Sequence, residues 1–321
     1  MARLLVTGAS GLLGANLVLE AMATHQVTAA SRRRRVRVAG VSSYRTDLTD
    51  RQAAQALVAE AGPDWIVHCA AATDVDGCQS DPEWAQALNR DMAEHVAAAA
   101  RQHQADFVFI STDAVFDGET GDYDETAEPQ PMSVYGSSKR AGEQAVLRAH
   151  PQAFIVRTNI YGWNAQPKHS LAEWFLQRCQ AGLRSPGWTD VSSTPILVND
   201  LAGVILRLLA TGRAGVYHVG GATCLSKYEF GRRVAAAFDF DPELIAPSSV
   251  QEAQLKAPRA LRLCLRCDKT ESVLGWRLPT VDEGLARFRR LRDEGWVSRL
   301  KEAVAEAAPA TMPSDGEDMP R

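Results

Sequence analysis

The first half of the chain alternates short apolar runs, rich in β-branched residues, with longer stretches in which apolar residues recur at helical spacing. The first pattern predicts strands and the second predicts helices. Strands are expected at residues 3–7, 27–30, 37–44, 65–69, 106–111 and 153–157, and helices at 12–22, 50–61, 82–103 and 133–150. Such alternation is typical of right-handed βαβ units. We therefore predict an α/β fold with a doubly wound parallel sheet of the Rossmann type.

The alternation loosens after about residue 163, where Pro, Gly and Trp become frequent. Helices are expected at 199–210, 226–238, 282–294 and 298–307, and a strand at 215–219. We predict a dinucleotide-binding domain made of residues 1–162 plus about 197–221. A smaller C-terminal substrate lobe then takes about 163–196 and 222–307. Residues 308–321 are polar and Pro-rich, so we expect a disordered tail.

Composition and charge exclude several classes of protein. The 321 residues are 45% hydrophobic and carry a net charge of −4, whereas a general nucleic-acid-binding protein normally has a basic excess. No apolar run approaches the roughly 20 residues of a membrane span, and Thr7-Gly8 follows the N-terminus too soon for a signal-peptide core. We expect a cytoplasmic protein with no nucleic-acid or membrane partner. The oligomeric state stays open, a homodimer included.

The six cysteines lie at positions 69, 78, 179, 224, 264 and 267, and in such a protein they are expected to be reduced thiols. Cys264 and Cys267 form a CxxC pair. A structural zinc site usually needs a second such pair or histidines, and the sequence has no second pair. We therefore predict no metal site.

A glycine-rich turn follows the first predicted strand. Gly8, Gly11 and Gly14 form a GxxGxxG pattern, and a helix is expected to begin near Leu12. In dinucleotide-binding folds these glycines allow a tight turn, close approach to a pyrophosphate and close packing of helix on strand. The first N–H groups of the helix then point at the phosphates. The position between strand and helix favours a cofactor site over a plain glycine turn.

Four arginines follow the second predicted strand, directly after Ser31. At this position an acidic residue binds the ribose 2′-hydroxyl of NAD, whereas arginine accommodates the 2′-phosphate of NADP. The alternative is a solvated basic turn. Because guanidinium groups suit a dianionic phosphate, we predict NADPH/NADP as cofactor, with Arg32 and Arg33 as the first candidates.

A YxxxK pattern is formed by Tyr135 and Lys139, which share one face if the segment is helical. Carbonyl reduction needs a proton donor beside the hydride donor, and a nearby ammonium is expected to lower the pKa of a tyrosine from about 10. Thr112 ends the preceding strand, where α/β sheets bind their ligands. The alternatives are a surface pair for Tyr135 and Lys139 and a turn-forming hydroxyl for Thr112.

Together these motifs resemble the extended short-chain dehydrogenase/reductases. The segment Ser111 to Gly118 (STDAVFDG) is similar to the STDxVFDG segment of dTDP-4-dehydrorhamnose reductases. Residues 70–76, 157–162 and 194–201 fit the same group. The resemblance covers about residues 1–290.

The resemblance implies roles for individual residues. Tyr135 is the proton donor, Lys139 binds the nicotinamide ribose and tunes Tyr135, and Thr112 polarises the substrate oxygen. The implied cofactor-binding residues are Gly8, Ser10, Gly11, Leu12, Leu13, Gly14, Ser31, Arg32, Arg33, Asp47, Leu48, Cys69, Ala70, Ala71, Ala72, Ser111, Tyr135, Lys139, Asn159, Ile160 and Tyr161. The implied substrate residues are Asp74, Val75, Thr112, Asp113, Tyr135 and Trp163.

The implied function is NADPH-dependent reduction of the keto group of a nucleotide-linked 4-keto-6-deoxysugar, which makes the chain an NADP-dependent oxidoreductase. Two departures stand out, namely Ala114 where many relatives have tyrosine, and Pro258 to Arg262 where an R-P-x-N/D stretch is usual. One alternative is an epimerase or dehydratase of the same superfamily, although dehydratases carry Thr-Asp-Glu where this chain has Thr-Asp-Ala. The other is a non-catalytic, cofactor-binding regulatory subunit.

Overall fold

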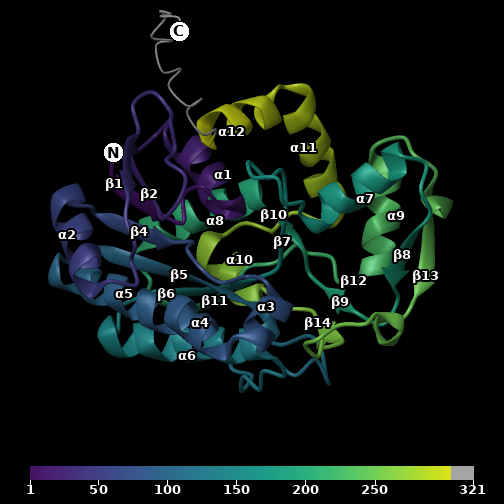
Figure 1. Cartoon of the computed structure of the whole chain (residues 1–321), viewed down its shortest axis with the longest axis horizontal. Helices are drawn as coiled ribbons and strands as arrows, with labels where there is room; N and C mark the ends of the chain where they lie inside the picture. Colours follow the sequence, from purple (N-terminus) through teal and green to yellow (C-terminus); the bar gives the residue numbers. More distant parts are fainter. Residues whose placement is uncertain (305–321) are drawn as a thin grey trace, which may run out of the picture.

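A seven-stranded parallel sheet forms the centre of the computed structural model, which describes residues 1–304 (Figure 1). The strand order is β11-β6-β5-β4-β1-β2-β3. The strands are β1 (Arg3–Thr7), β2 (Gln26–Ser31), β3 (Ser42–Arg45), β4 (Trp65–His68), β5 (Asp106–Thr112), β6 (Phe154–Thr158) and β11 (Gly215–His218). The predicted Rossmann-type α/β fold is confirmed. The predicted third strand begins five residues too early, and the disordered-tail prediction for 308–321 lies outside the described residues.

Helices cover both faces of this sheet, because alternate side chains of a strand point to opposite faces. Leu4 and Val6 of β1 belong to the core shared with α1 (Leu12–Ala21) and α8 (Val198–Thr211). Leu5 faces the other way. That second core is completed by α2 (Arg51–Ala61), α5 (Met92–Gln102) and α6 (Val134–Ala149). The sheet is therefore buried on both faces, as its nearly continuous apolar strands require.

The helix predicted over 82–103 is interrupted in the middle. It consists of α4 (Pro82–Gln86), a π-helical turn at Ala87–Asp91, and α5. The wider turn carries the buried Asn89, whose amide bonds both backbone groups of Ala72 and the hydroxyl of Ser138. Such π-turns are frequent at functional sites. Here the turn fixes the segment after β4 against helix α6.

The C-terminal part is built from much shorter strands. These form three small sheets, which are β7 (Ile160–Tyr161) with β10 (Ile196–Leu197), β13 (Ile245–Ser248) with β8 (Ser185–Trp188), and β12 (Leu225–Ser226), β9 (Ser192–Ser193) and β14 (Arg262–Leu263) in that order. The remaining helices are α3 (Val75–Ser80), α7 (Leu171–Gln180), α9 (Lys227–Ala237), α10 (Asp268–Leu274), α11 (Val281–Asp293) and α12 (Trp296–Val304). Capping boxes start α7, α9 and α11, so side chains bind backbone N–H groups at the first turn of each helix.

A disulfide joins Cys224 to Cys264, with Cα atoms 5.6 Å apart. The prediction that all six cysteines are reduced is wrong for these two. Cys264 bonds the exposed Cys224, which lies next to β12, rather than its CxxC neighbour Cys267. The bond therefore ties the two outer strands of the β12-β9-β14 sheet together, a pairing that sequence spacing cannot show.

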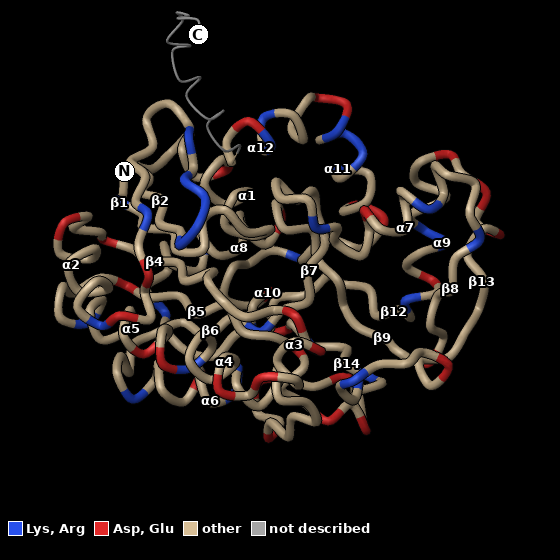
Figure 2. The backbone as a smooth tube through the Cα atoms, in the orientation of Figure 1, with Lys and Arg blue, Asp and Glu red and all other residues tan. Residues whose placement is uncertain are grey.

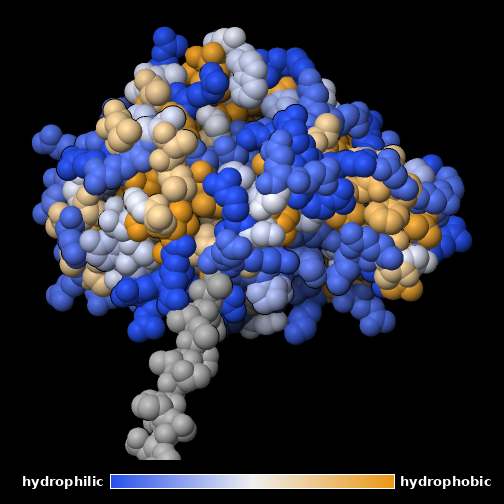
Figure 3. All heavy atoms as spheres, turned by 90° about the horizontal axis from the view of Figure 1, so that it is seen from above, coloured by the Kyte–Doolittle hydropathy of each residue, from blue (hydrophilic) through white to orange (hydrophobic). Residues whose placement is uncertain are grey.

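The surface carries mostly polar side chains with smaller apolar areas between them, as the face in Figure 3 shows. Within residues 1–304, no helix is long and apolar enough to cross a membrane. The same part of the chain contains no group of three or more His, Cys, Asp or Glu side chains arranged to hold a metal ion.

Candidate active site

Two adjoining cavities open at the carboxyl ends of the central strands. The larger, of about 630 Å³, is lined by side chains that follow β4, β5 and β6 and by residues of the C-terminal part. The smaller, of about 600 Å³, lies over the glycine turn and the end of β2. Gly11, Cys69, Ala71 and Gln166 line both, so the two spaces form one continuous groove. This is where doubly wound sheets bind ligands.

The glycine turn packs so tightly against neighbouring backbone that side chains larger than hydrogen do not fit at Gly8 and Gly14. Gly8 has φ +63°, and a Cβ there would lie 2.5 Å from the Ala70 nitrogen. A Cβ on Gly14 would lie 2.3 Å from the Gly8 oxygen. Helix α1 begins at Leu12 without a side-chain cap, which leaves its first N–H groups available to phosphate oxygens. The turn therefore fits a dinucleotide pyrophosphate.

The smaller cavity is basic on one side. Ser31, Arg32, Arg33 and Arg34 line it at the end of β2, and Figure 2 shows the arginine run as the long blue stretch beside that strand. Asp47 lies opposite, with its carboxylate 4.0 Å from the Arg32 guanidinium. These side chains can bind the adenosine end of NADP, including a 2′-phosphate.

The proposed catalytic side chains come together at the larger cavity. Tyr135 and Lys139 lie on α6, and Thr112 ends β5. The Lys139 ammonium donates a hydrogen bond of 2.6 Å to the Ile110 carbonyl and lies 3.9 Å above the Phe109 ring. Burial lowers the pKa of Lys139 to about 7. The structure thus brings all three predicted side chains to one wall, where a carbonyl can reach both hydroxyls.

The expected lowering of the pKa of Tyr135 is not found. Burial raises the pKa of Tyr135 to about 12, and the hydrogen bond with Thr112 offsets only part of that rise. Lys139 is not among the causes of this shift. A phenol with this pKa stays protonated at neutral pH, which is the form that can donate a proton.

A buried carboxyl group lies directly beside Thr112. Asp113 accepts hydrogen bonds from the Thr112 hydroxyl (3.0 Å) and from the Asn159 amide (2.7 Å). Burial nevertheless raises the pKa of Asp113 to about 6. The side chain lines the larger cavity and can accept hydrogen bonds from a sugar hydroxyl.

Helix α6 is held to the sheet by a buried ion pair. Glu143 accepts two hydrogen bonds from Arg157 of β6, at 2.9 and 2.8 Å, and one of 2.6 Å from Ser111 of β5. Both partners of the ion pair are almost fully buried. Because Ser111 directly precedes Thr112, this network fixes α6 relative to the end of β5.

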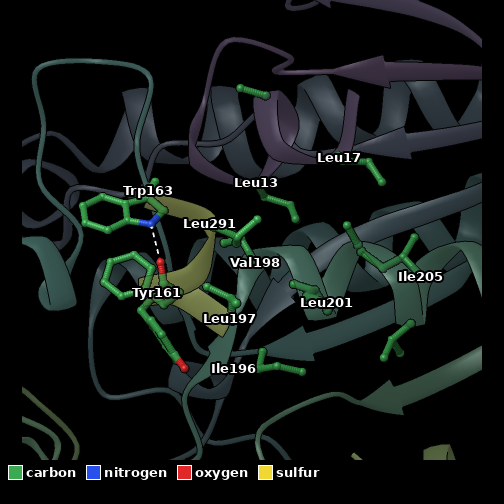
Figure 4. Close-up of a cluster of buried hydrophobic side chains, with 14 of the residues drawn as sticks. Leu13, Leu17, Tyr161, Trp163, Ile196, Leu197, Val198, Leu201, Ile205 and Leu291 are labelled. Atoms are coloured by element: carbon green, nitrogen blue, oxygen red, sulfur yellow. Dashed lines mark hydrogen bonds between the residues drawn. The ribbon is translucent and has the colours of Figure 1, made fainter. Parts of the chain in front are cut away.

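Most of the predicted site residues line one of the two cavities, but four do not. Trp163 is 7% exposed, stacks on Phe288 with ring centroids 4.0 Å apart and donates a hydrogen bond to the Phe288 carbonyl (Figure 4). Tyr161 packs in the same core. Asp74 caps α3, and Ala72 is buried against Asn89. Trp163 packs in the core and the exposed Asp74 caps α3, so neither lines a cavity, and their contacts with the sugar stay predictions.

The sequence analysis missed several lining residues from the C-terminal part. The larger cavity is also lined by Lys227, Arg259, Ser192 and Ser193, which lie on or beside the β12-β9-β14 sheet, and by Lys168 and His169. Their segments are far apart in sequence, so no local motif joins them. A lysine at the first position of a helix, where the helix dipole disfavours a cation, is the one local sign that could have found Lys227.

Comparison with known proteins agrees with this geometry. The RmlD substrate binding domain family matches residues 2–291. The chain is 34% identical to a dTDP-4-dehydrorhamnose reductase of Mycobacterium tuberculosis, over 99% of this chain and 97% of that protein. The structure of a dTDP-4-dehydrorhamnose reductase from Bacillus anthracis in complex with NADP matches with a TM-score of 0.81 at 30% identity, covering 90% of this chain and 99% of that one. The methionine adenosyltransferase 2 subunit beta of Xenopus tropicalis is 31% identical, over 92% of this chain and 90% of that protein.

Proposed function

The chain belongs to the RmlD substrate binding domain family, and from this membership we propose that it is an NADPH-dependent reductase of a nucleotide-linked 4-keto-6-deoxysugar. The observation that carries the proposal is the meeting of Thr112, Tyr135 and Lys139 at one wall of a cavity that continues into the basic groove beside Arg32. The family relatives that are named as reductases support the same reaction.

When bound, NADPH supplies the hydride for the carbonyl carbon. The glycine turn and the arginine run hold its phosphates, and Lys139 lies where it can bind the nicotinamide ribose. Tyr135 donates its phenolic proton to the substrate oxygen. Thr112 rotates its hydroxyl from Asp113 toward the same oxygen, so that its hydrogen bond strengthens as negative charge develops there.

The two alternatives make different predictions. An epimerase or dehydratase retains oxidised cofactor, and this chain has Ala114 where dehydratases carry a glutamate. A regulatory subunit, which the likeness to a methionine adenosyltransferase subunit favours, binds cofactor without turnover. The complete set of Thr112, Tyr135 and Lys139 supports the reductase over both.

The proposal is tested by following NADPH oxidation with dTDP-, UDP- and GDP-linked 4-keto-6-deoxysugars. We expect turnover with at least one of them, and Thr112→Val should lower kcat with a modest change in KM, because a transition-state interaction is lost. Clear NADPH binding without turnover on any of the three would favour the regulatory subunit. Purification with tightly bound NAD⁺ would favour the epimerase or dehydratase.

A further inference from the structure

Lys227 has an unusual place at the start of helix α9. Ser226 caps this helix by accepting a hydrogen bond from the Glu229 N–H, and the Glu229 carboxylate bonds the Ser226 N–H in return. Lys227 is the first residue of the helix, where the helix dipole favours anions and disfavours cations. A residue that opposes the preference of its local backbone position is expected at functional sites more often than at structural ones.

The environment of the Lys227 ammonium leaves it available to a ligand. The nitrogen lies 4.2 Å from the centroid of the Trp188 ring, which holds the side chain through a cation–π contact. Among residues 1–304, no carboxylate oxygen lies within 4.0 Å of this nitrogen, and no protein group forms a hydrogen bond with it. Burial and the nearby Arg259 lower the pKa of Lys227 to about 8, and Asp113 opposes that shift. The side chain therefore stays mainly charged at neutral pH.

Arg259 places a second cation on the same wall. Its guanidinium lies 3.1 Å from the Asp76 carboxylate of α3, and the Ala257 N–H bonds the same oxygen at 2.9 Å. The loop that carries Arg259 is thereby fixed to α3, whose first residue Val75 also lines the cavity. Lys227 follows β12 and Arg259 precedes β14, and these are the two strands that the Cys224–Cys264 disulfide joins.

The same cavity also holds the proposed catalytic hydroxyl groups. Thr112 and Tyr135 line it from β5 and α6, next to the carboxyl group of Asp113, and contribute neutral hydroxyl groups. In a nucleoside-diphosphate sugar whose keto carbon lies at these hydroxyls, the anomeric oxygen and the diphosphate leave from the opposite side of the sugar ring. We propose that Lys227, together with Arg259, binds the substrate diphosphate. The inference rests on the proposed function, because that function places the keto group at Thr112 and Tyr135.

The test measures affinity for ligands with and without the diphosphate. Binding of dTDP, UDP, GDP and their nucleosides to the NADPH-loaded protein is measured by calorimetry for the parent, Lys227→Met and Lys227→Arg. A hydrogen bond to a charged group contributes about 1.5–3 kcal/mol, so Lys227→Met should weaken the tightest nucleoside diphosphate about 10- to 100-fold. Nucleoside and NADPH affinities should stay within about twofold. Lys227→Arg should restore most of the loss, because arginine also binds phosphate.

Lys269→Met is the matched control. Lys269 also lies over an aromatic ring, 4.6 Å from the centroid of Tyr217, but it lies outside both cavities. The Lys269→Met variant should therefore bind nucleoside diphosphates with the same affinity as the parent. The inference is overturned if no nucleoside diphosphate binds the parent. It is also overturned if Lys227→Met lowers kcat but leaves diphosphate affinity intact, because Lys227 would then interact with Asp113 or with the sugar instead of the diphosphate. Equal loss of nucleoside affinity would also overturn it, because Lys227 would then only shape the cavity. If the parent shows no turnover but Lys227→Met still weakens diphosphate binding, the inference about Lys227 stands and the proposed reductase function is wrong.

Discussion

The two walls of the larger cavity are built in opposite ways. The wall with Thr112, Tyr135 and Lys139 stands on long parallel strands and a 16-residue helix, fixed from behind by the buried Glu143–Arg157 pair. The wall with Lys227 and Arg259 stands on strands of two residues, held by the capping box of α9, the partly buried Arg259–Asp76 ion pair and a disulfide. Substitutions in the first should change chemistry or global stability, and those in the second should change substrate affinity.

The sharpest test of the catalytic wall is Tyr135→Phe, which removes one hydroxyl and keeps the ring. General-acid catalysis contributes about 10²–10⁴-fold, so kcat should fall within this range while NADPH affinity changes little. Steady-state kinetics on the accepted 4-keto sugar nucleotide, with cofactor titration, measures both. Near-normal turnover would mean that another group donates the proton. A fall in kcat that comes with a large loss of unfolding free energy would instead mean that Tyr135 supports the fold.

The support behind this wall should show the next largest effect. Glu143→Gln leaves the buried Arg157 guanidinium without its counter-charge, which typically costs about 3–5 kcal/mol of unfolding free energy. Burial raises the pKa of the Glu143 carboxyl, but the bonds from Arg157 and Ser111 outweigh burial and leave the pKa lowered. The carboxylate therefore stabilises the fold fully above its unfolded pKa, and this contribution is lost as pH falls through the folded pKa.

Chemical denaturation across the acid range measures this effect, and the C-terminal part offers a control. Arg233 and Asp282 form an exposed ion pair there, and such pairs contribute about 0–1 kcal/mol. Asp282→Asn should therefore change stability little. If Glu143→Gln were as mild as Asp282→Asn, the catalytic wall would not depend on its buried pair.

This difference between the walls also explains which parts were predictable. The glycine turn, the arginine run and the YxxxK pair are local in sequence, because the first joins β1 to α1, the second directly follows β2 and the third lies within α6. The wall with Lys227 and Arg259 joins segments about 30 residues apart through two-residue strands, which carry no periodicity to read. Trp163 lines neither cavity because its ring turns into the core, which proximity to the site in sequence does not reveal.

The disulfide gives the clearest test within the C-terminal part. It closes a loop with a sequence separation of 40, and removing a disulfide typically costs about 2–4 kcal/mol. Cys224→Ser should lower the unfolding free energy by about this amount and raise KM for the sugar nucleotide, while NADPH affinity stays unchanged because the cofactor groove lies on the other half. The matched control is Cys267→Ser, which removes a thiol from the same region and leaves the bond intact.

A thiol count decides whether the bond forms in the isolated protein. Under denaturing, non-reducing conditions the four free cysteines should react and the other two should not. Six reactive thiols would restore the expectation of a fully reduced protein. They would also mean that this wall is held without a covalent bond between β12 and β14.

The smallest predicted effect concerns the cofactor groove, where sequence and structure agree most closely. The parent should bind NADPH at least about tenfold more tightly than NADH, a difference of roughly 1.4 kcal/mol. Arg32 and Arg33 line the groove at the end of β2, so changing both to alanine should erase most of this preference by weakening NADPH alone. The exposed Arg35 belongs to the same run but does not line the groove, and Arg35→Ala controls for the general loss of positive charge. Fluorescence titration with both cofactors measures the ratio of the two affinities.

Equal affinities for NADPH and NADH in the parent would show that the arginine run is a solvated turn. If Arg35→Ala reduced the preference for NADPH as much as the Arg32 and Arg33 double change does, the electrostatic field of all four arginines, rather than contact with a 2′-phosphate, would set that preference.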